Sequence, residues 1–366
     1  MGAGGVCEVT RSRRLPPRLS AAPLSLPPRR QLLRALAVLI PLGVMANVGV
    51  ALATTDRELV DALWGISWEP VALAAVLSVF PWLTQAVRIV IWTRFVDHPI
   101  PFLAGVRIAA GGVLGSAVTP TAVGGGSIRW ALATRHGLPP GQAASLLAVE
   151  AVEDVTFFAL ALPSAALLSA PSEAVLLRRL IGREGILRPE AGVGLGIALA
   201  VVALVFLLVR LARRGRLGAG LQDRTARLAD RLRAPIRAFL ADFRRTARLV
   251  ARRGKRWFAL SLVCTGLQWI ARYSMATVVI AALGGPLRPF LYWVLGWATY
   301  AVSSGAPTPG AAGAAEATFL LLHTPFVPAA LLVVTTALWR LMMFYVPALV
   351  AVLVYPALGP FVRRQR

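Results

Sequence analysis

Residues 120–130, PTAVGGGSIRW, interrupt an apolar stretch with one proline, three consecutive glycines and a positive charge at Arg129. Proline and glycine both weaken a helix, proline because it lacks a backbone N–H and glycine because of its conformational freedom. Irregular backbone is tolerated inside a membrane only where protein or a water-filled cavity satisfies its polar groups. We therefore expect residues 103–130 to form a broken element beside an internal polar site of a membrane protein.

The composition of the whole chain agrees with this expectation. Hydrophobic residues occupy 57% of the 366 positions and charged residues only 15%, and the mean hydropathy is +0.69, which is far more apolar surface than one soluble core needs. The net charge of +23 comes almost entirely from arginine, since Lys255 is the only lysine. The composition predicts an all-α, polytopic membrane protein.

The cysteines and histidines predict neither a disulfide framework nor a metal site. Cys7 lies in a polar tail and Cys264 in an apolar stretch, so a disulfide between them is not expected. His98, His136 and His323 lack the spacing of metal ligands. We expect no metal and no other cofactor.

Apolar stretches of about 20 residues, the length that crosses the hydrocarbon core as a helix, define the predicted spans. They cover approximately residues 32–54, 71–93, 143–169, 191–211, 257–283 and 326–355. Two further stretches, 103–123 and 290–324, are interrupted by glycine and proline. The sequence predicts six full spans plus two broken re-entrant elements, or eight full spans if both broken stretches cross the membrane.

The distribution of arginine predicts the orientation, because short cytoplasmic loops have an excess of Lys and Arg. Both terminal tails and residues 210–256 are strongly basic, which places both termini in the cytoplasm. The element at 103–130 then enters and leaves the membrane from the cytoplasmic side, and the element at 290–324 does so from the outside. Broken elements that enter from opposite faces favour a central cavity and an inverted repeat.

On this basis the chain divides into five parts. They are a basic Pro/Arg-rich tail (1–30), a first membrane half (31–209) with the broken element 103–130, a basic amphipathic helix (210–256), a second membrane half (257–356) with the broken element 290–324, and a basic tail (357–366). Arg29 and Arg30 resemble a twin-arginine export signal, but the apolar stretch after them is almost long enough to span the membrane, which favours an uncleaved first span.

Residues 210–256 have apolar side chains at three- to four-residue steps with arginines between them. This pattern predicts a basic amphipathic helix with a kink at Pro235. Such a helix suits the surface of the anionic cytoplasmic leaflet, and the adjoining spans favour that use over nucleic-acid binding. We expect membrane lipids as the partners of this segment, and no nucleic acid.

Ionisable residues inside apolar stretches are a further indication of function, because each costs about 2.5–3.5 kcal/mol on insertion scales. They are Arg88, Arg129, Glu150, Glu153, Asp154, Arg272, Glu316 and Arg340. The spacing of Glu150, Glu153 and Asp154 puts all three on one broad helix face. Their mutual repulsion predicts arginine partners, for which Arg88 and Arg129 are the candidates. Alternatively, the carboxylates lie at the interface and reach cytoplasmic water.

The second broken element contains SSGAPTPGAAGAAEATFLL, residues 303–321. Its spacing matches that of the first element, with Pro307, Gly313 and Glu316 in place of Pro120, Gly126 and Arg129. The two terminal charges are opposite in sign. The match favours an internal repeat in which broken helices meet near the membrane midplane and present helix ends to a charged substrate.

A phosphate inside the bilayer needs hydrogen-bond donors that replace its water, and backbone N–H groups and the planar fork of arginine can supply them. The first broken element offers both, in Gly124, Gly125, Gly126, Ser127 and Arg129. It lacks the Lys-Ser/Thr pair of a nucleotide-binding loop, so ATP is not expected. Close helix packing is the alternative use of these glycines.

These features, in this order, resemble the transmembrane region family of lysylphosphatidylglycerol synthases, often called flippase-like proteins. They are Arg88, a P-x3-GG-x3-R element (Pro120, Gly124, Gly125, Arg129), an acidic pair (Glu150, Asp154) and a P-x-PG-x2-G-x2-E element (Pro307, Pro309, Gly310, Gly313, Glu316). The resemblance covers most of residues 32–355. It implies a membrane domain that moves lipid headgroups between leaflets or assists a lipid-modifying enzyme. The chain differs from the family at Ala151, where members usually have arginine, and no soluble aminoacyltransferase domain is expected before its end at Arg366.

The sequence therefore predicts a flippase-like protein of the cytoplasmic membrane that moves a phospholipid or a polyprenyl glycolipid and is not an enzyme. Arg129 and Arg88 would bind the phosphate, and the carboxylates of Glu150 and Asp154 would neutralise the charges of these arginines. Glu316 would contact a positive headgroup or pair with Arg129 in a closed state.

Two alternatives remain at this stage. One is a non-catalytic accessory subunit that docks a lipid- or glycan-modifying enzyme through residues 210–256. The other is a membrane-embedded glycosyl- or phosphotransferase that uses outer-loop carboxylates such as Asp56 or Glu58. The outer loops are short and lack a convergent acid/base set, which disfavours the enzyme.

Overall fold

The computed structural model describes residues 68–119, 124–169, 237–306 and 308–358, and within these ranges the chain folds into helices without a β-strand. Three long helices are α3 (Trp68–Phe95), α6 (Pro140–Leu168) and α10 (Lys255–Ala282). A fourth continuous helical run consists of α13 (Ala329–Arg340), a π-helical turn (Leu341–Tyr345) and α14 (Val346–Ala357). These four coincide with four predicted spans, and the predicted spans at 32–54 and 191–211 lie outside the described residues.

Two of these runs, Trp68–Phe95 and Ala329–Ala357, are both long and apolar enough to cross a membrane. Helix α6 with 29 residues and α10 with 28 residues have the length as well, since 28 residues of helix measure roughly 42 Å. Large apolar side chains are exposed along α10 at steps of three or four residues, namely Leu260, Val263, Leu267 and Ile270. A surface of this kind suits contact with lipid and is rare on soluble monomers. The number of spans stays a prediction.

Helices α4 (Phe102–Val118) and α5 (Gly124–Arg135) pack against each other as a hairpin. Thr119 ends α4 in an extended conformation, as expected for a residue that precedes proline. Its hydroxyl donates to the carbonyl oxygen of Gly115 at 2.8 Å and accepts from the N–H of Gly124 at 3.0 Å, which ties the two helices together. Helix α4 thus ends before Pro120, as the proline predicts, whereas Gly124, Gly125 and Gly126, which were expected to interrupt a helix, lie in the first turn of α5.

Glycines let α4 and α5 approach closely. A Cβ atom at Gly115 would lie 2.8 Å from the carbonyl oxygen of Gly124, and one at Gly125 would lie 2.9 Å from the carbonyl oxygen of Gly112. Real Cβ atoms do not approach backbone so closely, so a larger residue would separate the helices. By contrast, a Cβ at Gly126 would meet nothing within 4 Å. The packing role considered for these glycines therefore applies to Gly124 and Gly125, and not to Gly126.

A second hairpin is formed by α11 (Pro289–Ser303) and α12 (Ala314–His323). Gly310 and Gly313 in the break have φ angles of +58° and +81°, a region that glycine enters without strain. The side chain of Glu316 caps α12, since its Oε2 accepts a hydrogen bond from the N–H of Gly313 at 2.9 Å. Pro307, one of the predicted site residues, lies outside the described residues.

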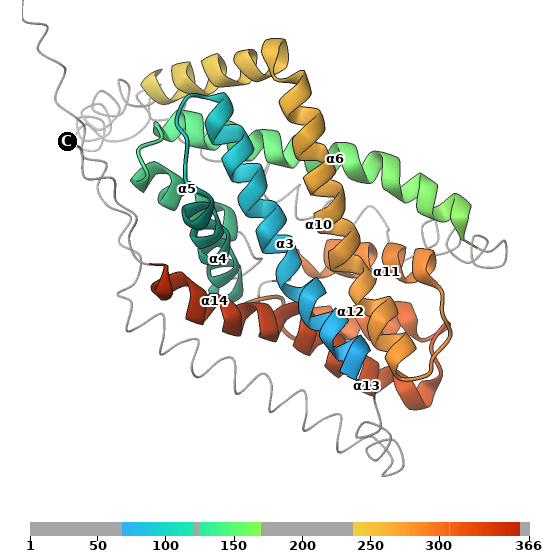
Figure 1. The fold of residues 1–366 in the computed structure, drawn as a ribbon. Coiled ribbons are helices and arrows are strands. Elements are labelled where there is room, and N and C mark those ends of the chain that lie inside the picture. Colours follow the sequence, from blue (N-terminus) through green and yellow to red (C-terminus); the bar gives the residue numbers. More distant parts are fainter. Residues whose placement is uncertain (1–67, 120–123, 170–236, 307, 359–366) are drawn as a thin grey trace, which may run out of the picture.

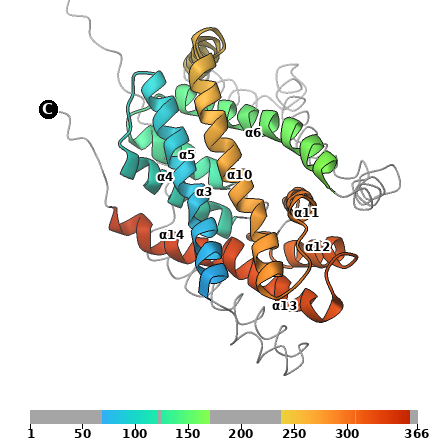
Figure 2. The same cartoon turned by 45° about the vertical axis from the view of Figure 1, so that its right-hand side comes forward.

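The helices form two sets with matching contacts. Helices α3 and α10 run side by side through the middle of the fold, while α6 and the α13–α14 run lie to either side of them (Figures 1 and 2). Each hairpin begins beside one of the central helices, α4 against α3 and α11 against α10. Helix α6 then packs on α11, and α14 packs on α4. An internal repeat would produce such an exchange of contacts, and the repeat itself stays a prediction.

Residues 237–253 form a helix that leads into α10. Its arginines, Arg237, Arg244, Arg245, Arg248, Arg252 and Arg253, are all exposed, whereas Phe239, Phe243 and Val250 are partly buried. This part agrees with the basic amphipathic helix predicted for 210–256. The rest of that prediction, including the kink at Pro235, lies outside the described residues.

Candidate functional site

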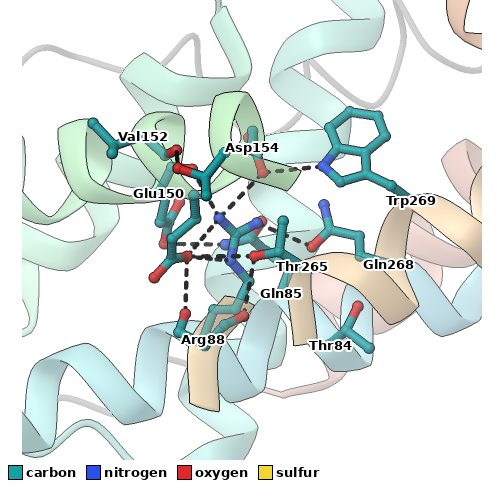
Figure 3. Close-up of polar contacts among 12 residues, drawn as sticks. Thr84, Gln85, Arg88, Glu150, Val152, Asp154, Thr265, Gln268 and Trp269 are labelled. Carbon is teal, nitrogen blue, oxygen red and sulfur yellow. Dashed lines mark hydrogen bonds and ion pairs between the residues drawn. The ribbon is translucent and has the colours of Figure 1, made fainter. Parts of the chain in front are cut away.

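Arg88 of α3 lies between α6 and α10 with only 1% of its side chain exposed (Figure 3). Its Nε and Nη2 donate to Glu153 Oε2 at 3.1 and 2.9 Å, and Nη2 also lies 3.2 Å from Asp154 Oδ1. Further bonds run from Nη2 to the carbonyl oxygen of Glu150 and from Nη1 to Gln268 Oε1. Nearly all the donor capacity of this guanidinium is therefore used within the protein.

Glu153 is the main partner of Arg88 and is fully buried. Besides Arg88, it accepts hydrogen bonds from Trp92 Nε1 at 2.8 Å and from Ser261 Oγ at 2.9 Å. A charge in an apolar interior is tolerated only when it is paired and its remaining lone pairs are bonded. Glu153 and Arg88 meet both conditions, so they form a neutral, satisfied unit that joins α3, α6 and α10.

Arg129 of α5 and Glu150 of α6 form a second pair near the first. Arg129 Nη1 lies 2.7 Å from Glu150 Oε2, and Gln85 Nε2 donates to Glu150 Oε1 at 3.1 Å. The side chain of Arg129 is 24% exposed, in contrast to that of Arg88. A cavity of about 30 Å³ lies beside this pair, enough for two or three water molecules at about 10–15 Å³ each. Arg129 is thus the more accessible of the two predicted cations.

Asp154 lies at the edge of the Arg88 network, with 32% of its side chain exposed. Its Oδ1 accepts a hydrogen bond from Trp269 Nε1 of α10 at 3.0 Å (Figure 3). The predicted acidic pair, Glu150 and Asp154, therefore meets the predicted arginines: Glu150 pairs with Arg129, and Asp154 lies against Arg88. Ala151, where the family usually has arginine, is exposed on α6, so this difference lies on the side of α6 away from the network.

The second hairpin brings its own charged pair together. Glu316 Oε1 of α12 lies 2.9 Å from Arg340 Nε of α13. Arg340 also donates from Nη2 to the carbonyl oxygen of Gly310 at 2.7 Å and places its guanidinium 4.3 Å from the centre of the Phe344 ring. The π-helical turn begins directly after Arg340, and such turns are frequent at functional sites.

The two hairpins hence show the same arrangement with reversed charges. In the first, the hairpin supplies the cation Arg129 and the next long helix the anion Glu150. In the second, the hairpin supplies the anion Glu316 and the next helix the cation Arg340. The contact between Arg129 and Glu316 that we expected for a closed state is absent from this structure, in which each has a different partner.

The other predicted residues lie around these pairs. Gly124 and Gly125 pack against α4, Gly126 and Ser127 follow on α5, and Ser127 is exposed. Gly310 contributes its carbonyl oxygen to Arg340, and Gly313 contributes its N–H to Glu316. The structure thus distributes the predicted site over two clusters, one at each hairpin.

Several functional candidates were not in the predicted set. The sequence predicts Arg340 only as a charged residue in an apolar stretch and Glu153 only as a member of the carboxylate face that arginine neutralises. Four residues of α10 are not predicted at all, namely Ser261, Thr265, Gln268 and Trp269. Ser261, Thr265 and Gln268 lie four and then three residues apart, which places them on one helix face. This polar stripe in an apolar helix is a pattern that the sequence does contain. In the described ranges, no group of His, Cys, Asp and Glu side chains suits a metal ion.

A buried ionic network within long helices whose outer faces are apolar defines a helical membrane protein. The family model of the lysylphosphatidylglycerol synthase TM region matches residues 33–351, and the chain belongs to this family. It is also similar to a UPF0104 membrane protein of Archaeoglobus fulgidus, with 23% identity over 322 residues that cover 83% of this chain and 92% of the relative. The resemblance drawn from the sequence motifs is thereby confirmed.

Proposed function

We propose that this protein moves the headgroup of a phospholipid or polyprenyl glycolipid between the leaflets of the cytoplasmic membrane. The observation that supports this most directly is the pair of broken hairpins, each of which brings one charged residue to a partner on the following long helix. Broken helices that present charges inside the membrane are a feature of transporter sites. The family of the chain is compatible with a role in membrane lipid chemistry.

The geometry favours different roles for the two predicted arginines. Arg88 is enclosed and satisfied by α6 and α10, so it holds the carboxylates in place. Arg129 is partly exposed and makes one ion pair, with Glu150. In this proposal a lipid phosphate competes with Glu150 for Arg129 and receives further hydrogen bonds from the backbone around Gly126 and Ser127.

The second hairpin offers the complementary exchange. A positively charged part of the headgroup competes with Arg340 for Glu316, whose side chain is 18% exposed. In this proposal the hairpins are re-entrant from opposite faces, both termini are cytoplasmic, and the basic face of residues 237–253 contacts anionic lipid. The protein performs no covalent chemistry and needs no cofactor.

The test is lipid translocation by the purified full-length chain in liposomes that contain fluorescent phospholipids. Reduction of the outer-leaflet fluorophore measures how much lipid has crossed. We expect protein-dependent translocation that Arg129→Ala and Glu316→Ala abolish. The matched controls are Arg135→Ala, an exposed arginine on the same helix α5, and Glu69→Ala, an exposed glutamate in the first turn of α3. Translocation that survives both site variants would refute the proposed site.

The accessory-subunit alternative is favoured by one observation, the exposed row of arginines on residues 237–253. It predicts that a neighbouring lipid- or glycan-modifying enzyme copurifies with the protein and is lost when several of these arginines are replaced by glutamine. Absence of translocation by the wild-type chain, combined with such copurification, would support this alternative over a flippase.

A further inference from the structure

One charged residue of α10, Arg272, lies outside the hydrogen-bond network around Arg88. Ser261, Thr265, Gln268 and Arg272 lie on one face of α10, because they follow each other at steps of four, three and four residues. The hydroxyls of Ser261 and Thr265 donate to Glu153. Gln268 accepts a hydrogen bond from Arg88 (Figure 3). Arg272 is the next member of this stripe, roughly 6 Å further along the helix axis than Gln268.

Arg272 has no anionic partner within the described part of the chain. Its guanidinium carbon lies 5.8 Å from the centre of the Trp269 ring and 5.6 Å from that of Tyr300, and the ion pairs found there involve other arginines. Its Nε is buried, and none of the residues that the structure describes accepts a hydrogen bond from it. Cation–π contacts are weaker than charge-assisted hydrogen bonds, so this cation lacks its strongest kind of partner.

A second donor lies on the same aromatic cluster. The Tyr273 ring stacks on Trp269 at 5.3 Å and lies 6.4 Å from Tyr300, and its hydroxyl is buried without a partner in the described ranges. Arg272 and Tyr273 thus share two aromatic neighbours while both retain unused donors. Unsatisfied buried donors are rare in proteins and call for a missing acceptor.

The cluster is linked to the first pair and is open on one side. Arg129 pairs with Glu150, Arg88 connects Glu150 to Asp154, and Trp269 bonds Asp154 and contacts Arg272. The Tyr300 side chain is 41% exposed, and Arg272 is half-buried, so a ligand can reach the guanidinium.

We infer that Arg272 and the Tyr273 hydroxyl form a second binding site within the membrane, which follows the Arg129 site along the path of the lipid. This site binds an oxyanion of the phosphate type. The ligand is the phosphate of a lipid headgroup or inorganic phosphate, which present the same acceptor oxygens. The proposed function supplies the reason why a phosphate would reach this depth. The absence of an anionic partner for Arg272 and of a hydrogen-bond partner for the Tyr273 hydroxyl, among the described residues, is observed independently of the proposed function.

The test is equilibrium binding by the full-length chain in a neutral detergent, with phosphatidylglycerol labelled on its acyl chain. Diacylglycerol with the same label serves as the probe that lacks phosphate. We expect Arg272→Gln to weaken phosphatidylglycerol binding by about tenfold or more, since hydrogen bonds to charged groups are the strong ones, and to leave diacylglycerol binding unchanged. Arg272→Lys should retain part of the affinity because it keeps the charge and loses the planar fork.

Two further variants keep the test decisive. Arg107→Gln is the matched control, because Arg107 is also half-buried and lies 4.8 Å from the centre of an aromatic ring, that of Tyr355. It should bind within about twofold of wild type, which is the size of an ordinary remote effect. Tyr273→Phe keeps the stacked ring and removes only the hydroxyl, so it decides the question if Arg272→Gln fails to fold, and we expect it to weaken binding several-fold.

The outcomes separate the site from the proposed function and one ligand source from the other. Wild-type affinity in both Arg272→Gln and Tyr273→Phe, or an equal loss in Arg107→Gln, would overturn the inference even if translocation is observed. A selective loss of phosphatidylglycerol affinity in Arg272→Gln and Tyr273→Phe would establish the anion site even if liposomes show no translocation. Displacement of the labelled lipid by inorganic phosphate would assign the site to free phosphate as well, and its failure would assign the site to the lipid.

Discussion

Replacing Glu153 by glutamine removes the negative charge that neutralises Arg88 while keeping the shape of the side chain. Arg88 is only 1% exposed and cannot turn to water. Removing one partner of a buried ion pair costs about 3–5 kcal/mol. Asp154 would remain 3.2 Å from Nη2 of Arg88, so we expect the lower end of that range, about 3 kcal/mol of unfolding free energy. This corresponds to roughly a hundredfold change in the unfolding equilibrium.

The measurement is unfolding of the purified protein in mixed micelles of a mild detergent and dodecyl sulfate, followed by circular dichroism. Glu69→Gln is the matched control, because Glu69 is exposed on the same helix as Arg88, and it should stay within about 0.5 kcal/mol of wild type. The double variant Arg88→Met/Glu153→Gln removes both charges, so neither member of this pair is left as an uncompensated buried charge. We therefore expect it to be no less stable than Glu153→Gln alone.

Two results would refute the reasoning. One is a Glu153→Gln protein that is as stable as the Glu69→Gln control. The other is a double variant whose loss equals the sum of the two single losses, because strict additivity would mean that Arg88 and Glu153 are not coupled.

Three further changes test the hairpins. Gly125→Ala should lower the unfolding free energy by about 1–3 kcal/mol, because its Cβ would meet the backbone of α4. Gly126→Ala should be tolerated in the same unfolding assay. Equal effects of the two substitutions would contradict the packing geometry. Thr119→Val removes the hydroxyl that bonds both sides of the first break, and a loss of about 1 kcal/mol is expected by the same measurement; no loss would mean that the turn does not depend on it. Arg340→Met should loosen the second break, because it removes the ion pair with Glu316 and the hydrogen bond to the carbonyl oxygen of Gly310. Proteolysis there should become faster than in wild type, and unchanged cleavage would argue against this role.

Part of this architecture can be predicted from the sequence because it depends on local chemistry. Pro120 predicts that α4 ends before it, since the effect of proline on a helix does not depend on distant residues, whereas the three glycines begin α5 instead of interrupting a helix. The spacing of Glu150, Glu153 and Asp154 likewise predicts a shared face that arginine must neutralise. Both expectations agree with the helices and ion pairs described here.

The choice of partners could not be predicted because it depends on how distant helices pack. The carboxylate of Glu153 rather than that of Glu150 pairs with Arg88, which requires that α3 and α6 both pack on α10. Glu316 pairs with Arg340 although the matching spacing of the two breaks suggested a meeting with Arg129. Spacing along the chain reveals which residues are equivalent, but not which ones touch.

The reversed charges of the two hairpins have an electrical consequence. Moving one elementary charge through the full membrane potential changes the energy by about 2.3 kcal/mol per 100 mV. Helix α5 contributes the positive charge of Arg129 and α12 the negative charge of Glu316. If both helices shifted equally in the same direction during a transport cycle, these two contributions would cancel, and the step would be indifferent to voltage. If they shifted in opposite directions, the contributions would add, and the membrane potential itself would drive the step.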